Sequence, residues 1–224
     1  MTQTSNARGN ATRQANKALR KERLLSIARE IISNNGFEAF TINELASKAQ
    51  LSIPTVHNLL GKKSDIFEQL VVEMVAKVEV ALAQPNVHDP IVATEAFIDS
   101  LLDLFTANEA FYKAAFVAGE RTQFFDHELP NGIFNKSLAI ATQVCVDAKN
   151  NGFLKGQVDV AWLAKQLFGC QRLARHDWVN GYISLAEYRV QVLIGAFITL
   201  AADATPSFQE RLYEIIKSLT DTPL

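Results

Sequence analysis

The sequence predicts an all-α protein made of a basic N-terminal part and a larger, acidic helical part. Along most of the 224 residues, apolar side chains recur at intervals of three and four, the spacing of an amphipathic helix. No segment shows a convincing alternation of apolar and polar residues, which would mark a half-buried strand. Residues 1–63 hold ten lysine or arginine and four aspartate or glutamate residues, whereas residues 64–224 are net acidic. Such asymmetry indicates that the basic end meets nucleic acid.

The chain is expected to begin with a disordered basic arm, residues 1–16, and a first helix from about residue 17 to residue 34. The arm is polar and has no period. Its cationic residues suit contact with phosphates or entry into a minor groove, and the alternative is a tail that is merely solvated. In the first helix, Leu24 and Ile31 belong to an apolar stripe, and Gly36 is the stop signal.

Residues 41–63 contain the signals of two short helices separated by a turn. Thr41 lies three residues before Glu44, the spacing of a capping box. Ser52 offers a second N-cap oxygen, and Pro54 falls in the first turn that follows, where its missing N–H is not needed. Two such helices form a helix-turn-helix unit. Because a helix this short is unstable alone in water, we expect the unit to stand on a small three-helix core.

Over about residues 23–67, the sequence resembles the N-terminal DNA-binding domain of the TetR family of one-component bacterial transcription regulators. The resemblance rests on the family pattern of helix 2, the turn and helix 3, which reads here as Thr41, Leu45-Ala46, Leu51-Ser52, Thr55-Val56-His57, Leu60 and Lys63. Three residues depart from the pattern: Gln50 stands where a turn glycine is usual, His57 replaces tyrosine and Leu60 replaces phenylalanine. Gln50 would then have to accept a strained φ. On this basis residues 17–63 form a helix-turn-helix domain, and residues 64–224 form a helical effector-binding and dimerisation domain.

The second short helix would present its outward face to the major groove of DNA. Val56, Leu59 and Leu60 fall on the inward face. By position and by resemblance, the DNA-binding candidates are Thr41, Ser52, Ile53, Pro54, Thr55, His57, Asn58 and Lys63. Asn58 is the best base reader, because its amide can pair with adenine N6 and N7. Thr41 and Lys63 should hold phosphates. Plain capping is also part of the role of Thr41 and Ser52, and the alternative for His57 is an exposed or half-packed histidine.

From residue 64 onward the chain reads as helix after helix. The expected segments are 64–83, 90–107, 109–119, 133–150, 159–180, 184–203 and 207–219. Aromatic residues are dense from about residue 97 to residue 134, which suits a mostly apolar pocket, although an ordinary helical core explains them as well. The resemblance implies that the effector pocket lies here, and the candidates are Phe97, Phe105, Phe116, Phe125, Trp162, Gln166 and Arg172.

Small residues among apolar ones in the last two long helices, including Gly169 and Gly195, permit close approach of helices. In the family the corresponding pair forms a four-helix bundle with its mate. The resemblance therefore implies a homodimer, and the alternative is packing within one chain. A dimer also meets an energetic need, because one short helix contributes too little discrimination to specify an operator alone.

Composition excludes several other classes of protein. No window approaches a membrane span, and the first residues lack the apolar region of a signal peptide, so we expect a cytoplasmic protein. Catalytic motifs are absent, and the histidines and the two cysteines share no ligand spacing, so we expect no enzyme, no cofactor and no metal. The predicted function is a transcriptional repressor that a small, largely apolar ligand releases from a palindromic DNA operator. The alternative is a DNA-binding protein of the same fold that responds to a protein partner or to no ligand.

Overall fold

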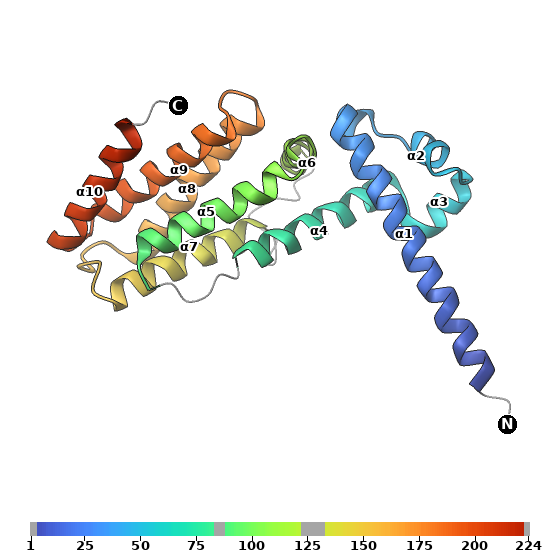
Figure 1. Cartoon of the computed structure of the whole chain (residues 1–224), viewed down its shortest axis with the longest axis horizontal. Coiled ribbons are helices and arrows are strands. Elements are labelled where there is room, and N and C mark those ends of the chain that lie inside the picture. The colour runs from blue at the N-terminus through green and yellow to red at the C-terminus, as the bar shows by residue number, and fades with distance from the viewer. Residues whose placement is uncertain (1–3, 83–87, 122–132, 222–224) are drawn as a thin grey trace. The chain divides into compact units, whose positions relative to one another are not determined.

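The computed structural model describes residues 4–82, 88–121 and 133–221, and these ranges are helical except for short connections (Figure 1). The described part contains ten α-helices and no strand, apart from one isolated antiparallel bridge between Leu154 and Ala204. The helices are α1 (Thr4–Ala39), α2 (Ile42–Ala49), α3 (Ile53–Leu60), α4 (Lys63–Leu82), α5 (Pro90–Thr106), α6 (Glu109–Arg121), α7 (Ile133–Asn150), α8 (Val160–Val179), α9 (Leu185–Ala201) and α10 (Pro206–Asp221). The predicted all-α class is confirmed. Within the described ranges, no helix combines the length and the apolar character needed to cross a bilayer.

The helices form two compact units. The first comprises residues 1–74 with residues 110–118, and the second comprises residues 75–109 with residues 119–224. The first unit extends past the boundary expected near residue 63 because the start of α4 carries part of its core. Phe67 of α4 is 1% exposed, and its ring centroid lies 4.3 Å from that of Phe37.

The core of the first unit joins α1, α2, α3 and the start of α4. Its fully buried residues include Leu24, Ile31, Phe40, Leu45, Val56, Leu60 and Phe67. Burial of one such side chain contributes about 1.5–3 kcal/mol. This packing explains why α2 and α3, each only eight residues long, are stable here although neither would be stable alone.

α1 differs from the expected first helix at both ends. It begins at Thr4, so residues 4–16 are helical where the sequence predicts a disordered arm. Extending a helix that the core has already nucleated needs far less free energy than starting one, and residues 4–16 include three alanine and two arginine residues, which are good helix formers. At the other end, Gly36 has φ 77° and ψ 166° and interrupts the helical geometry, as its role as a stop signal predicts.

In the second unit, α8 packs against α7 and α9, and α9 also packs against α5 and α10. An aromatic cluster lies inside this bundle: Phe105 of α5 stacks on Trp178 of α8 with ring centroids 4.8 Å apart, and Tyr188 of α9 meets Phe105 edge-on. Gly195 allows α9 to approach α8 closely. A Cβ at this position would lie 2.8 Å from Cys170 Sγ, which is closer than atoms can pack.

Asp203, just after α9, fixes the connection between α7 and α8. Its side chain is buried, and its carboxylate accepts backbone N–H bonds from Gly156 at 2.8 Å, Gln157 at 2.9 Å and Val158 at 3.2 Å. The Asp203 carbonyl accepts a further bond from the N–H of Lys155. A buried carboxylate is tolerated when such donors replace its lost hydration, so this one residue organises the loop.

Candidate functional site

Side-chain caps define the start of both short helices in the first unit. Thr41 Oγ1 accepts the N–H of Glu44 at 3.2 Å and begins α2. Ser52 Oγ accepts the N–H of Thr55 at 3.3 Å and begins α3, and the two hydroxyl groups of Ser52 and Thr55 are 2.8 Å apart. The predicted caps are therefore confirmed. Each contributes about 1 kcal/mol and fixes where its helix begins.

Gln50 forms the turn between these helices in a left-handed conformation, with φ 56° and ψ 42°. It is the only residue other than glycine with positive φ among the described residues. The N–H of Gln50 donates to the carbonyl oxygen of Ser47, and the N–H of Leu51 donates to the carbonyl oxygen of Ala46. The turn is thus closed by hydrogen bonds despite the missing glycine, and the strain expected at Gln50 is present.

α3 has one buried face and one exposed face. Val56 and Leu60 are fully buried, and Leu59 is half-buried beside them. Most of the predicted DNA-binding residues lie on the exposed side of α3 and at its start. The exposed members are Thr41, Ser52, Ile53, Pro54, His57 and Asn58, and the half-buried members are Thr55 and Lys63. The structure therefore brings the predicted reading face together on one rigid, capped helix.

Two of these side chains already have partners in the protein. His57 Nδ1 lies 3.0 Å from the carbonyl oxygen of Gly61. Because a carbonyl only accepts, this nitrogen carries the proton, and in the neutral ring Nε2 is left as an acceptor. Lys63 Nζ donates to the carbonyl of Glu38 at 3.0 Å and lies 4.7 Å from the ring centroid of Phe37. Lys63 thus ties the start of α4 to the end of α1, and its remaining N–H groups are left for an anion.

The predicted ligand-binding residues are divided between the two units. Phe105 belongs to the aromatic cluster of the second unit, whereas Phe116 is buried in the part of α6 that belongs to the first unit. Phe97 is half-buried. Trp162, Gln166 and Arg172 are exposed on α8. Phe125 lies outside the described residues. As a ligand set, these seven residues stay a prediction.

A polar cluster inside the second unit is absent from that set. Arg175 of α8 and Tyr188 of α9 are both buried, and Gln171 Nε2 donates to Tyr188 Oη at 3.1 Å. Burial lowers the pKa of the Arg175 guanidinium, and it raises the pKa of Tyr188 to about 12. The available signal was the four-residue spacing of Gln171 and Arg175, which puts both on one face of α8. Perturbed groups of this kind are enriched at functional sites.

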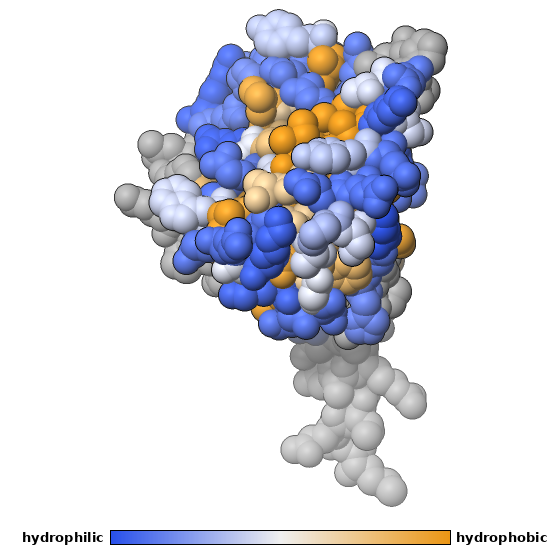
Figure 2. Space-filling model, turned by 90° about the vertical axis from the view of Figure 1, so that its left-hand side faces the viewer, coloured by the Kyte–Doolittle hydropathy of each residue, from blue (hydrophilic) through white to orange (hydrophobic). Residues whose placement is uncertain are grey.

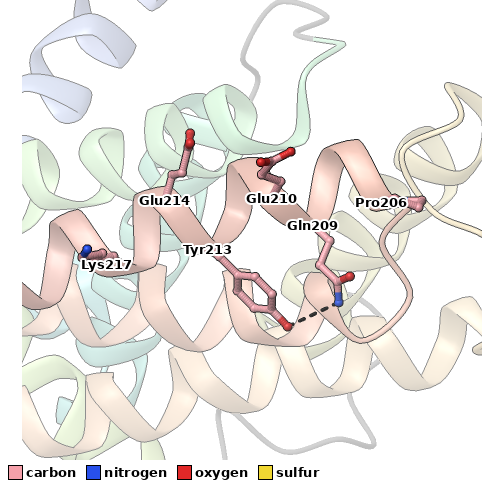
Figure 3. Close-up of a pocket in the computed structure, with 6 residues that line it drawn as sticks. All are labelled: Pro206, Gln209, Glu210, Tyr213, Glu214 and Lys217. Atoms are coloured by element: carbon pink, nitrogen blue, oxygen red, sulfur yellow. Dashed lines mark hydrogen bonds between the residues drawn. The ribbon is translucent and has the colours of Figure 1, made fainter.

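A separate depression of about 410 Å³ lies along α10 (Figure 3). It is lined by Pro206, Gln209, Glu210, Tyr213, Glu214 and Lys217. Because a single helix supplies every lining residue, this is an open surface groove. None of the predicted ligand residues borders it.

α8 and α9 also expose apolar side chains. Trp162 is 61% exposed, Leu173 is 58% exposed and Ile198 is 57% exposed, which is unusual for residues of this size. Figure 2 shows a face of the second unit on which apolar residues interrupt a largely hydrophilic surface. Gly169, on the exposed face of α8, has no atom within 4 Å of the position that a Cβ would take. The two small residues thus differ: Gly195 serves packing within the chain, and Gly169 faces open space.

Comparisons with known proteins agree with this arrangement. The family model of the bacterial regulatory proteins of the tetR family matches residues 24–70, and no curated protein matches the chain. A TetR-family transcriptional regulator from Marinobacter aquaeolei VT8 has a similar structure, with a TM-score of 0.64 at 16% identity over 89% of this chain and 98% of that one. A gamma-butyrolactone receptor described as ArpA-like has a TM-score of 0.61 at 16% identity, over 91% of this chain and 97% of that one. The TetR family protein CprB from S. coelicolor A3(2) has a TM-score of 0.58 at 14% identity, over 92% of this chain and 100% of that one. The helix-turn-helix region therefore matches the tetR family of bacterial regulatory proteins, and the chain as a whole has the fold of structures of TetR-family transcriptional regulators.

Proposed function

We propose that this protein is a homodimeric transcriptional repressor that binds a palindromic DNA operator and is released by a small, largely apolar ligand. The observation that carries the DNA-binding part is the exposed face of α3. Ile53, His57 and Asn58 are held outward on a helix whose opposite residues, Val56 and Leu60, are locked in the core. A rigid helix that holds its side chains outward in this way is what major-groove reading requires.

The side chains of this face suggest which bases they read. Asn58 can form a bidentate pair with adenine N6 and N7. The neutral His57 ring offers Nε2 as an acceptor, which matches the amino group of adenine or cytosine. Ile53 and Pro54 suit contact with thymine methyl groups. The N-terminus of α2 beside Thr41 offers backbone N–H groups to a phosphate.

Dimerisation through α8 and α9 is the proposed means of pairing two reading helices. Two half-sites about 34–36 Å apart are needed to reach successive major grooves on one side of DNA. The exposed Trp162, Leu173 and Ile198 supply apolar area for a seam between two copies, and the open Gly169 permits close approach of helices.

The cluster of Gln171, Arg175 and Tyr188 is the proposed place where the polar group of an effector is recognised. It lies among aromatic side chains, so an effector with an apolar body and one polar end fits its chemistry. That one structural neighbour is a gamma-butyrolactone receptor supports an effector of this kind. Release from DNA follows only if the ligand binds the DNA-incompetent state more tightly than the competent one.

The DNA-binding part is tested by selecting protected sequences from random duplexes and then measuring their affinity for variants. Asn58→Ala is expected to weaken binding by about 1–3 kcal/mol, roughly 5- to 150-fold in Kd, and to relax one position of the half-site. Asn150→Ala is the matched control, because Asn150 is an exposed asparagine at the end of α7 in the other unit. Equal affinity of the Asn58 variant and the wild type would contradict the assignment of α3 as the reading helix.

The effector part needs a separate test. Thermal-shift screening of small apolar metabolites, including alkyl butyrolactones, should find a compound that raises Tm, and the same compound should release the selected duplex. Arg175→Met should lose that release while it still binds DNA. If compounds raise Tm without releasing DNA, or if none binds, regulation by a protein partner becomes the better explanation.

A further inference from the structure

The N-terminal half of α1 is a cationic helix that projects beyond α2 and α3 (Figure 1). All side chains from residue 12 to residue 20 are exposed, and no side chain from residue 12 to residue 23 is buried. This segment contributes nothing to the core of the first unit, so packing does not explain its composition. It contains Arg13, Lys17 and Arg20 within eight residues.

These three cations share one face of the helix, and that face has a fixed direction. Arg13, Lys17, Arg20 and Leu24 follow one another at intervals of four, three and four residues, and Ala28 and Ile31 continue the series. Residues spaced in this way form a single stripe along an α-helix. Leu24, Ala28 and Ile31 are all buried, and α1 packs against α2 and α3. The cationic stripe is therefore a continuation of the core-facing stripe, and it points to the side of α1 on which the helix-turn-helix lies.

The charge on this stripe is not neutralised. Glu22 is the only acidic residue before Glu30, and at about 100° per residue it lies half a turn away from the stripe. Within the described part of the chain, Arg13, Lys17 and Arg20 form no ion pair. A row of free cations on one side of a rigid helix is complementary to a row of phosphates.

We propose that Arg13, Lys17 and Arg20 form a second DNA-binding element that grips the phosphate backbone flanking the sequence read by α3. This inference rests on the proposed DNA binding and adds a helical, face-specific clamp in place of a flexible basic tail. Arg13 and Arg20 are separated by about 10 Å along the helix at 1.5 Å per residue. At about 3.4 Å per base pair, the clamp therefore covers roughly three base pairs beside each half-site.

A charge-relocation variant tests whether the face matters. This variant combines four substitutions: Arg13→Ala with Ala15→Arg, and Lys17→Ala with Ala18→Lys. Together they move two cations to the back of the helix. The variant keeps the composition and net charge, and all four positions are exposed, so folding should be preserved; circular dichroism checks the helix content. The matched control, Arg13→Lys with Lys17→Arg, keeps the stripe. The probe is a fluorescein-labelled 30-base-pair duplex of random sequence, since phosphate contacts do not depend on sequence.

Loss of two phosphate contacts should reduce the slope of log affinity against log salt by about 1.8. Between 50 and 200 mM salt, the wild type and the matched control should then lose about tenfold more affinity than the relocated variant. Identical slopes for all three proteins would overturn the clamp while leaving DNA binding by α3 intact. Reduced sedimentation of the relocated variant with phosphatidylglycerol vesicles, with unchanged DNA binding, would also overturn it by assigning the stripe to a membrane surface. A wild type that binds no duplex at 50 mM salt would refute both proposals.

Discussion

Gly195→Ala and Gly169→Ala form a matched pair of substitutions that separates packing within one chain from packing between two copies. Both glycines lie inside helices, Gly169 in α8 and Gly195 in α9. Replacing a glycine by alanine in a helix interior stabilises an isolated helix by about 1 kcal/mol. Any difference between the two variants must therefore come from their surroundings.

The surroundings predict opposite signs. At Gly195 the new methyl group would lie 2.8 Å from Cys170 Sγ and 2.9 Å from Cys170 Cβ. Rotation could move the sulfur away, but the Cβ moves only with the backbone of α8. Overpacking of this kind costs about 1–3 kcal/mol, so the net loss of unfolding free energy is about 1 kcal/mol. At Gly169 no atom lies within 4 Å, so the alanine should stabilise the isolated chain by about 1 kcal/mol and weaken its association with a second copy.

Urea unfolding gives the free energies, and sedimentation equilibrium gives the dimer dissociation constant. Unfolding should be followed at several protein concentrations, because the apparent stability of a dimer depends on concentration. We expect Gly195→Ala to lower the unfolding free energy and to leave the dimer dissociation constant of the folded protein nearly unchanged. Gly169→Ala should raise the dissociation constant. If Gly195→Ala is as stable as Gly169→Ala, the close crossing of α8 and α9 is wrong; if Gly169→Ala dimerises normally, the seam lies elsewhere.

Three further predictions follow from single residues. Gln50→Gly should raise the unfolding free energy by about 1 kcal/mol, because it removes left-handed strain of about 1–2 kcal/mol while adding some freedom to the unfolded chain; a loss in urea unfolding would argue against strain at this turn. Asp203→Asn should lower the unfolding free energy by about 3 kcal/mol, because an amide donor would face backbone N–H groups, and a change below about 0.5 kcal/mol would contradict this role. Burial raises the pKa of both Tyr188 and Cys145 to about 12. As the pH rises, the unfolded chain loses these two protons before the folded chain does, so the stability that the two buried groups contribute should be complete below about pH 9 and lost as pH rises towards 12. The urea midpoint of Tyr188→Phe should therefore fall less steeply with rising pH than that of the wild type.

The boundaries of the helices could be predicted because their signals are local. Thr41 and Ser52 each cap an N–H only three residues along the chain, so the sequence alone contains both partners. Gly36 interrupts its helix through its own φ angle. For the same reason, strain at Gln50 could be expected from its position in the motif. None of these features depends on which helix packs beside which.

The lining of an effector site could not be predicted, because it depends on which face of a helix is buried. α8 carries large apolar residues on two faces: Phe168 and Trp178 are buried, whereas Trp162 and Leu173 are exposed. Spacing along the sequence shows that the two pairs of residues lie on different faces of α8, but it does not show which face meets α7 and α9. A helix that is apolar on two faces is typical of one that packs within its own chain and against a second chain. The exposed Trp162 therefore supports the proposed seam.

Two of the three departures from the family pattern, Gln50 and His57, act on different properties. Gln50 leaves the turn in the conformation that a glycine would adopt, and the bonds that close it use only backbone groups, so this change affects stability and leaves the position of α3 unaltered. His57 changes what α3 offers to DNA. Where a tyrosine hydroxyl could donate to a phosphate, the imidazole commits its Nδ1 proton to Gly61 and leaves an acceptor outward. An acceptor at that position repels phosphate oxygens and favours an exocyclic amino group, so His57 is better suited to select a base than to hold the backbone.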